Sequence, residues 1–355
     1  MVEDLLRYKD KRVFITGHTG FKGSWLSYLL DKYGASVMGF SLTPTTEPSL
    51  FNNLNFSSSF KSVIGDIRDF SLIQKELDSF KPDYIFHLAA QPLVLESYRN
   101  PYETFTANTL GTLNVLEAIR KGDYSTTAII VTTDKVYENL ELNIPFKEDD
   151  KLGGKDPYSA SKSAAEIITY SYQKSFCETN EKKIASVRAG NVIGGGDWSE
   201  DRLIPDLIKA HFNQSKVKIR NPDATRPWQH VLEPLMGYIE LALKLKEEPK
   251  ENLGAWNFGP ANDDIQSVRQ IVDKSIMLGF INQVEYGKPD VQEAKYLKLN
   301  ISKAINKLNW KPIWNCEKSI EKTFNWYKEF YLKKNAEELI INDINDYLND
   351  RKQLI

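Results

Sequence analysis

The sequence lacks several features that would place it in a specialised class of protein. Its 355 residues include only two cysteines, Cys177 and Cys316, which lie far apart and outside any metal-like spacing. A disulfide framework is therefore not expected. The protein is expected in a reducing compartment, the cytoplasm. The four histidines are scattered, with no pair three or four residues apart, so no metal site is predicted.

Long apolar runs and an excess of one charge are also lacking. No run approaches the roughly 18 apolar residues of a membrane-spanning helix, so no membrane partner is expected. The N-terminal stretch is charged and has no apolar region typical of a signal peptide. Lys and Arg number 46 against 48 for Asp and Glu, a net charge of −2, which argues against nucleic acid as a partner. The length allows about two domains with a large core.

Short apolar runs alternate with longer amphipathic stretches through the first part of the chain. The runs predict strands at residues 12–17, 36–41, 61–66, 83–90, 127–133 and 184–194. The amphipathic stretches predict helices at residues 24–34, 70–80, 101–121 and 157–176. This alternation implies βαβ units, so the predicted fold class is α/β, a Rossmann-type doubly wound parallel sheet. Such sheets bind ligands beyond the carboxyl ends of their strands, so the residues that follow each strand are the candidate site.

A glycine-rich turn joins the first predicted strand to the first predicted helix. The stretch TGHTGFKG places Gly17, Gly20 and Gly23 at three-residue intervals. Such glycines allow a tight turn, close approach of a pyrophosphate and close packing of the helix on the strand. The free amides of the helix then face the phosphates. An ordinary Gly-rich turn is the alternative, but the context favours a dinucleotide site, in which Phe21 and Lys22 are included.

The ends of the next strands refine the cofactor prediction. The stretch GFSLTPT offers Ser41 and two threonines but lacks the acidic residue that usually binds the ribose of NAD. It also lacks a lysine or arginine that could bind the 2′-phosphate of NADP. NAD is therefore favoured over NADP. Asp66 is placed to bond an adenine amine, or else it caps the following helix. Small residues after the fourth strand allow a backbone to lie against the cofactor. The other predicted cofactor-binding residues are Ile67, Leu88, Ala89, Ala90, Gln91, Asn108 and Thr132.

The regular alternation of predicted strands and helices ends after about residue 195. Gly- and Pro-containing stretches at 194–206, 219–231 and 254–264 predict polar loops within a smaller mixed α/β substrate-binding domain. The tail from about Glu317 predicts one or two solvated helices. The predicted domains are an NAD-binding Rossmann domain over 1–190, a mainly substrate-binding domain over 191–320, with segments that can return to the first, and a C-terminal helical tail over 321–355.

Two groups of polar residues suggest chemistry. In YSASK, Tyr158 and Lys162 share one face of a predicted helix. An ammonium nearby would lower the tyrosine pKa from its usual value of about 10, which makes Tyr158 a candidate acid or base for a hydroxyl beside a nicotinamide. In TTDKVYEN, Asp134 and Lys135 follow a central strand. The alternative to a catalytic role for these two residues is a surface ion pair, which would contribute only ~0–1 kcal/mol to stability.

These motifs together resemble the extended short-chain dehydrogenase/reductase superfamily and, within it, the nucleotide-sugar 4,6-dehydratases, most closely the group that acts on CDP-glucose. The resemblance covers nearly the whole chain, from ITGHTGFKGSW through TTDKVYEN, DPYSASKSAAE, VRAGNVIGGGDW and RPWQHVLEPL to YLKLNISKA. TGxxGFxG and YxxxK mark only the superfamily, whereas TTDKVYEN, GNVIGGGDW and RPWQHVLEPL are more specific. Relatives that act on dTDP-glucose carry Asp-Glu where this chain has Asp134 and Lys135.

The resemblance implies a role for each catalytic candidate. Thr133 matches the threonine that bonds the sugar C4 oxygen. Tyr158 matches the base that removes the C4 hydroxyl proton while hydride leaves for NAD, and Lys162 matches the lysine that bonds the nicotinamide ribose. Asp134 and Lys135 match the pair that handles water loss between C5 and C6. Lys135 is either the C5 base, neutral for part of the cycle, or a cation that positions Asp134 or a water.

The resemblance also implies a nucleotide-sugar substrate and further partners. Asn191 and Arg226 match residues that contact the substrate diphosphate, and Arg220 and Asp197 are candidates for contacts with the base or the sugar. A homodimer, or a tetramer, is expected through the helices at 101–121 and 157–176, in deoxysugar and O-antigen precursor biosynthesis. Two rival functions remain open. A nucleotide-sugar 4-epimerase would not need the Asp-Lys pair, and a catalytically silent NAD-binding protein would not need an intact tyrosine and lysine.

Overall fold

The computed structural model describes residues 2–177, 181–280, 283–287 and 296–354. Its centre is a seven-stranded parallel sheet in the order β11-β6-β5-β4-β1-β2-β3. The strands are β1 (Arg12–Thr16), β2 (Ser36–Ser41), β3 (Lys61–Ile64), β4 (Tyr84–His87), β5 (Thr126–Val131), β6 (Lys182–Ala189) and β11 (Gly254–Phe258). The chain winds outward in both directions from β1, which confirms the predicted doubly wound α/β fold.

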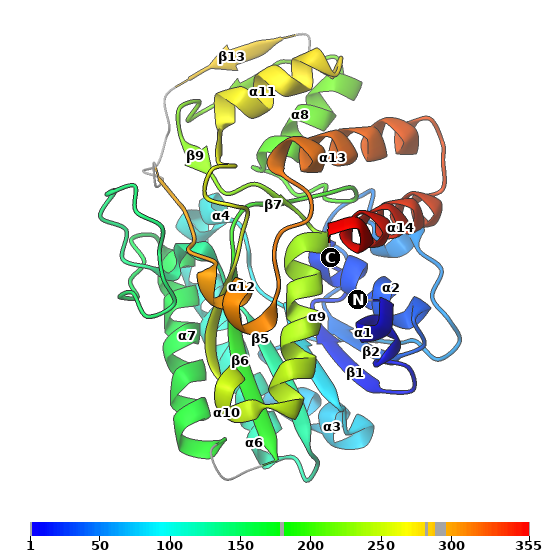
Figure 1. The fold of residues 1–355 in the computed structure, drawn as a ribbon, viewed down its shortest axis with the longest axis vertical. Coiled ribbons are helices and arrows are strands. Elements are labelled where there is room, and N and C mark those ends of the chain that lie inside the picture. The colour runs from blue at the N-terminus through cyan, green and yellow to red at the C-terminus, as the bar shows by residue number, and fades with distance from the viewer. Residues whose placement is uncertain (1, 178–180, 281–282, 288–295, 355) are drawn as a thin grey trace.

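Helices cover both faces of this sheet (Figure 1). One face carries α3 (Phe70–Phe80), α6 (Gly111–Lys121) and α7 (Pro157–Phe176), and the other carries α1 (Val2–Leu6), α2 (Phe21–Lys32) and α9 (Leu232–Glu247). Side chains along each strand alternate between the two hydrophobic cores. In β5, Ala128 and Ile130 belong to the core on the side of α3, α6 and α7, while Ile129 and Val131 belong to the core on the side of α1, α2 and α9. Burial of both faces explains why the strands are continuous apolar runs in the sequence.

Several helix boundaries differ from the predicted ones for local steric reasons. Helix α2 begins three residues earlier than expected, so Gly23 lies inside it, where a Cβ would meet the Gly17 carbonyl oxygen at 2.0 Å. The stretch predicted as one helix over 101–121 follows α4 (Val94–Arg99) and consists of α5 (Pro101–Phe105), a π-helical turn (Thr106–Leu110) and α6. Isolated π-turns within helices are frequent at functional sites.

Two strand predictions were wrong. The run at 184–194 divides, because β6 ends at Ala189 and β7 (Val192–Ile193) pairs instead with β10 (Gln229–His230). Residues 254–258, predicted as part of a polar loop, form β11, which pairs in parallel with β6 and packs against α9. Gly254 and Asn257 are unfavourable in strands, so the strand is formed because its neighbours in the sheet hold it in place.

Apart from α9 and the C-terminal helices, most elements after residue 195 are short and lie above the carboxyl edge of the main sheet (Figure 1). They are α8 (Leu203–Phe212), β8 (Val217–Ile219), β9 (Thr225–Arg226), β12 (Gln266–Ser267), α11 (Val268–Met277) and β13 (Val284–Tyr286). Two small sheets, β8 with β13 and β9 with β12, join them. Helices α10 (Pro249–Asn252) and α12 (Ser302–Leu308) return to the main sheet beside α9 and β11.

The C-terminal tail, predicted as one or two helices, forms two, α13 (Cys316–Tyr331) and α14 (Ala336–Leu354). The prediction that they are solvated was wrong for their inner faces, because Phe324 and Tyr347 belong to the main hydrophobic core. Tyr327 of α13 bonds the backbone of Asp197, accepting from its N–H at 2.9 Å and donating to its carbonyl. The tail therefore supports a loop of the cavity described below. Among the described residues, no helix combines the length and apolarity needed to cross a bilayer.

Candidate active site

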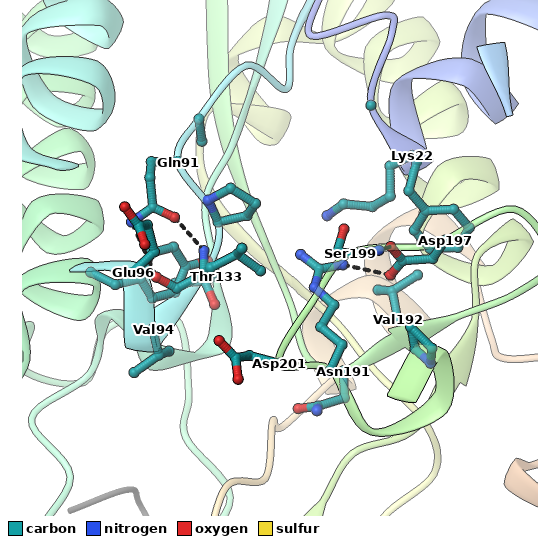
Figure 2. A pocket seen from close by; sticks show the side chains of 18 of the residues that line it. Lys22, Gln91, Val94, Glu96, Thr133, Asn191, Val192, Asp197, Ser199 and Asp201 are labelled. Atoms are coloured by element: carbon teal, nitrogen blue, oxygen red, sulfur yellow. Dashed lines mark hydrogen bonds and ion pairs between the residues drawn. The ribbon is translucent and has the colours of Figure 1, made fainter. Parts of the chain in front are cut away.

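A cavity of about 740 Å³ opens at the carboxyl edge of the sheet (Figure 2). Its lining includes a residue that directly follows each of the first six strands, namely Gly17, Leu42, Gly65, Leu88, Thr132 and Gly190. Doubly wound sheets bind their ligands at this edge, near the strand where the winding reverses. The cavity is therefore the site that the order of the strands predicts.

The glycine turn at the start of α2 is shaped for a ligand. Gly17 has a φ of +76°, and a Cβ there would lie 2.7 Å from the Ala89 amide nitrogen. A Cβ on Gly20 would meet no protein atom closer than the Gly17 carbonyl oxygen at 3.4 Å. Packing within the protein does not demand glycine at position 20, yet Gly20 borders the cavity and leaves the helix N-terminus without a side-chain cap. This arrangement leaves room for a phosphate to approach the backbone amides of α2.

Most residues predicted to bind a cofactor line this cavity. They are Gly17, Gly20, Phe21, Lys22, Gly23, Asp66, Ile67, Leu88, Ala89, Ala90, Gln91, Thr132 and Tyr158. The side chain of Lys22 points into it (Figure 2), and burial lowers the pKa of this lysine to about 7. A lysine that borders the cavity beside open amides suits an anionic ligand, because the charge of that ligand would favour the protonated amine.

The other two predicted cofactor residues, Asn108 and Lys162, lie behind the cavity wall. The Asn108 carboxamide, within the π-helical turn, accepts from the Gln91 N–H at 2.8 Å and donates to Ser161 Oγ at 2.9 Å. It thereby ties the loop after β4 to α7. Lys162 Nζ donates to the Val131 carbonyl oxygen at 3.1 Å, and burial lowers the pKa of this lysine to about 8.

Asp66 does not cap the helix that follows it. Asp69 does so, because its carboxylate accepts from the Leu72 N–H at 3.0 Å. Asp66 instead accepts from the backbone N–H of Arg68 at 2.8 Å and from its guanidinium, and the Arg68 side chain holds the pKa of this carboxyl below its usual range. The carboxylate remains on the cavity wall, where the predicted contact with adenine is possible.

The polar stretch after β5 forms a buried cluster. Asp134 Oδ1 accepts from the Thr133 hydroxyl at 3.0 Å and from Lys135 Nζ at 3.1 Å. The Asp134 side chain is only 1% exposed and that of Lys135 25%, which excludes the alternative of an ordinary surface ion pair. Asp134 Oδ2 has no hydrogen-bond partner within the described part of the chain. A buried carboxylate oxygen without a partner is costly, and it is typical of a group that acts on a ligand.

Tyr158 faces this cluster from α7. Its burial raises the pKa of the phenol, and the positive charge of Lys135 is the largest effect that opposes the rise. The cation with the largest opposing effect is therefore Lys135 and not Lys162, which donates to the Val131 carbonyl. The geometry couples the acid/base candidate directly to the pair after β5.

The four residues predicted to bind substrate, Asn191, Asp197, Arg220 and Arg226, line the same cavity. The Asp197 carboxylate is engaged by Arg202 at 2.8 Å and by the Ser199 N–H at 3.0 Å (Figure 2).

Arg202 is a cavity residue that the sequence analysis missed. The positive charge of Arg202 lowers the pKa of Tyr158 and so opposes the rise caused by burial. The one signal in the sequence was its place at the end of the Gly-rich loop, directly before α8.

The fold and the cavity define a class of protein. A doubly wound parallel sheet, a glycine turn at its central strand and a Tyr-x-x-x-Lys pair beside the same cavity are the features of a short-chain dehydrogenase/reductase of the extended type. Residues 14–323 match the family model described as GDP-mannose 4,6 dehydratase. The chain belongs to this family.

Individual relatives fall in two reaction types. The chain is 43% identical over 352 residues to a CDP-glucose 4,6-dehydratase of Salmonella typhimurium, with 96% of this chain and 97% of that protein covered. It is 29% identical to a UDP-glucuronate 4-epimerase of Thermodesulfobacterium geofontis, with 89% and 95% covered. Among solved structures, an epimerase of Methanothermobacter thermautotrophicus has a TM-score of 0.81 at 25% identity, with 96% and 97% covered. The fold also matches a dTDP-glucose 4,6-dehydratase from Bacillus anthracis in complex with NAD, with a TM-score of 0.74 at 22% identity over 90% and 97% of the chains.

Proposed function

We propose that the protein is a CDP-glucose 4,6-dehydratase, an NAD-dependent hydro-lyase that converts CDP-glucose to CDP-4-keto-6-deoxyglucose. The observation that carries the proposal is the buried Asp134–Lys135 pair beside Tyr158. A 4-epimerase needs an acid/base at C4 only, whereas a dehydratase also needs groups of opposite character at C5 and C6. The 43% identity to a CDP-glucose 4,6-dehydratase supports the choice of reaction and of substrate.

The residues that line the cavity fit NAD. The open backbone at Gly20 and the amides of α2 would hold its diphosphate, the loop Leu88–Gln91 would lie along it, and Asp66 would face its adenine. NAD, when bound, accepts a hydride from the sugar C4 and returns one to C6. Both cysteines are free thiols, which supports the proposed cytoplasmic location.

The side chains of the chain itself supply the proton transfers. Tyr158 acts as its phenolate, which the charges of Lys135 and Arg202 favour, and takes the C4 hydroxyl proton. It lies next to the Thr133 hydroxyl, whose hydrogen is directed at Asp134. The resulting 4-ketone makes the C5 proton acidic, and the C6 hydroxyl can leave once it is protonated. Asp134 and Lys135 lie 3.1 Å apart and so can serve the two adjacent carbons. The enclosed position of Asp134 limits the access of water to the pair.

We assign the remaining parts of the chain by the same proposal. Residues 1–190 bind NAD and carry the catalytic groups, 191–320 mainly bind substrate, and 321–355 support them. Asn191 and Arg226 hold the substrate diphosphate, because a guanidinium offers a fork of donors that suits phosphate oxygens. The product would be a precursor of deoxysugars, as in O-antigen.

The reaction is tested by incubating the protein with NAD and CDP-glucose. The alkali-induced absorbance of a 4-keto-6-deoxy product is expected, with no net production of NADH. Parallel assays with dTDP-, GDP- and UDP-glucose should give lower rates. Conversion to a C4 epimer without that absorbance would instead identify a 4-epimerase and would contradict the proposal.

Lys135→Ala should separate the two halves of the reaction. We expect C4 oxidation to persist but water loss to slow by at least about 100-fold, the lower end of general acid/base contributions. Lys135 also opposes the raised pKa of Tyr158, so its removal raises that pKa further and oxidation should require a higher pH. Single-turnover absorbance at the NADH band is the measurement, with exposed Lys151→Ala as the control. Normal water loss in Lys135→Ala would refute this role.

The proposed dimer would form through residues 101–121, which comprise α5, the π-helical turn and α6, and through α7. Tyr102, Ile167 and Tyr170 on these helices are 77%, 58% and 60% exposed, and an apolar patch of this kind marks an interaction surface. We expect Ile167→Glu to convert a dimer to a monomer in sedimentation velocity experiments. Met277→Glu, at an even more exposed apolar position on α11, should leave the mass unchanged. A monomeric wild-type protein at micromolar concentration would contradict the dimer.

A further inference from the structure

The segment that carries Asp134 and Lys135 is held at both ends by buried side chains. At its start, the Thr132 hydroxyl donates to the carboxylate of Glu166. At its end lies Tyr137, whose side chain is only 2% exposed. The ring stacks on Phe146 at a centroid distance of 4.7 Å. Thr132, Thr133, Asp134 and Lys135 line the cavity, whereas the anchoring side chains of Glu166 and Tyr137 do not.

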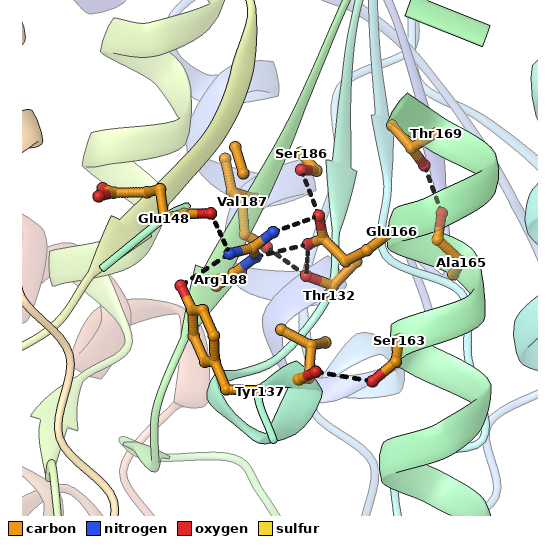
Figure 3. Close-up of polar contacts among 12 residues, drawn as sticks. Thr132, Tyr137, Glu148, Ser163, Ala165, Glu166, Thr169, Ser186, Val187 and Arg188 are labelled. Atoms are coloured by element: carbon orange, nitrogen blue, oxygen red, sulfur yellow. Dashed lines mark hydrogen bonds and ion pairs between the residues drawn. The ribbon is translucent and has the colours of Figure 1, made fainter. Parts of the chain in front are cut away.

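The Tyr137 hydroxyl uses its full hydrogen-bonding capacity. It accepts from Arg188 Nη1 at 2.7 Å (Figure 3), and it donates to Asn257 Oδ1 at 2.7 Å. The guanidinium of Arg188 also lies over its ring, with the carbon 4.8 Å from the centroid. The hydroxyl therefore joins the segment to β6 and to β11.

Arg188 connects this anchor to the helix that carries Tyr158. Its Nε and Nη2 donate to the two oxygens of Glu166 at 3.0 and 2.9 Å (Figure 3). Glu166 lies one helical turn after Lys162 on α7, and it is the partner that the Thr132 hydroxyl uses. One buried network therefore sets the end of the segment relative to the catalytic helix.

We propose that Tyr137 is a positioning residue for the elimination of water, an inference that rests on the proposed dehydratase function. Thr133 is positioned by the start of the segment and Tyr158 by α7, and both act at the sugar C4. Lys135 lies two residues from Tyr137 and depends on the far anchor. The Val136 carbonyl still accepts from Ser163 Oγ at 2.8 Å, so loss of the Tyr137 hydroxyl shifts Lys135 without unfolding the turn. A shift of about 1 Å can slow a reaction by about 100-fold.

The kinetic test uses Tyr137→Phe, which keeps the stacked ring and removes the hydroxyl. We expect water elimination to slow by about tenfold or more, within the range that small displacements produce, and C4 oxidation to change by less than about twofold. Single-turnover absorbance at the NADH band measures oxidation, and the alkali-induced absorbance measures elimination. Tyr8→Phe is the control, because it removes a buried hydroxyl that donates to the Ile239 carbonyl at 2.9 Å. Equal slowing of both steps, or of neither, overturns the proposal.

Hydrogen exchange gives a second readout that needs no turnover. In Tyr137→Phe, peptides over residues 132–138 should exchange their amide hydrogens faster, while peptides over 158–166 should not. Unchanged exchange at 132–138, or an equal effect of Tyr8→Phe, overturns the anchoring on which the proposal depends. A wild-type protein that oxidises C4 but does not eliminate water would contradict the proposed function, and the exchange result would still decide the anchoring.

Discussion

Tyr158→Phe is expected to lower the turnover of CDP-glucose by about 10²–10⁴-fold, the usual contribution of one general acid/base group. The variant keeps the buried ring on α7 and loses the hydroxyl that takes the C4 proton. Thr133 cannot replace it, because its hydroxyl hydrogen is directed at Asp134 Oδ1 at 3.0 Å. Every later step depends on the 4-ketone, so oxidation, water loss and product should decline together.

The measurement is the initial rate with saturating NAD and CDP-glucose, combined with an equilibrium titration of NAD. Cofactor affinity should remain within a few-fold of wild type, because the glycine turn is untouched. Tyr172→Phe is the matched control on the same helix, since its hydroxyl donates to Glu117 at 2.9 Å away from the cavity. Turnover near the wild-type level in Tyr158→Phe would remove this residue from the mechanism.

The parts of the fold that the sequence predicted well are those with a strong local pattern. Helices at 70–80 and 157–176 match α3 and α7, and the strand at 36–41 matches β2. β11 was missed because its residues suggest a turn and only pairing with β6 makes them a strand. The inner faces of α13 and α14 were also missed, because polar residues dominate their composition and the apolar minority alone contacts the core.

The residues of the candidate site could likewise be predicted only where a local sequence pattern marks them. Residues directly after strands, such as Gly17 and Thr132, could be predicted because parallel strands bring their carboxyl ends together. Arg202, by contrast, reaches the cavity from a loop whose path no local pattern specifies. Glu166 and Arg188 carry charges that are usually exposed, so nothing in the sequence marks them as a buried pair.

Arg188→Met should destabilise the protein by about 3–5 kcal/mol, the range observed when one partner of a buried ion pair is removed. The two side chains are 4% and 3% exposed, and Glu166 would lose both guanidinium contacts. The Thr132 and Ser186 hydroxyls would remain as its donors, which is too little to replace a charge. Urea unfolding measures the change. Arg269→Met, which removes an exposed partner of Asp223, should change stability by less than about 1 kcal/mol.

The uncompensated carboxylate makes this loss dependent on pH. In the wild-type protein the Arg188 charge and hydrogen bonds keep the pKa of Glu166 below its usual value despite burial, so the pair stabilises the fold at neutral pH and less so on acidification. In Arg188→Met burial outweighs the two remaining hydroxyl donors and raises that pKa, so the folded variant gains stability as Glu166 takes up a proton. The difference between the two proteins should therefore be larger at pH 8 than at pH 5. Glu166→Gln combined with Arg188→Met removes the charge and should recover part of the stability at pH 8. A loss independent of pH, with no recovery in the double variant, would mean that Arg188 acts through packing and its contact with Tyr137 and not through the charge of Glu166.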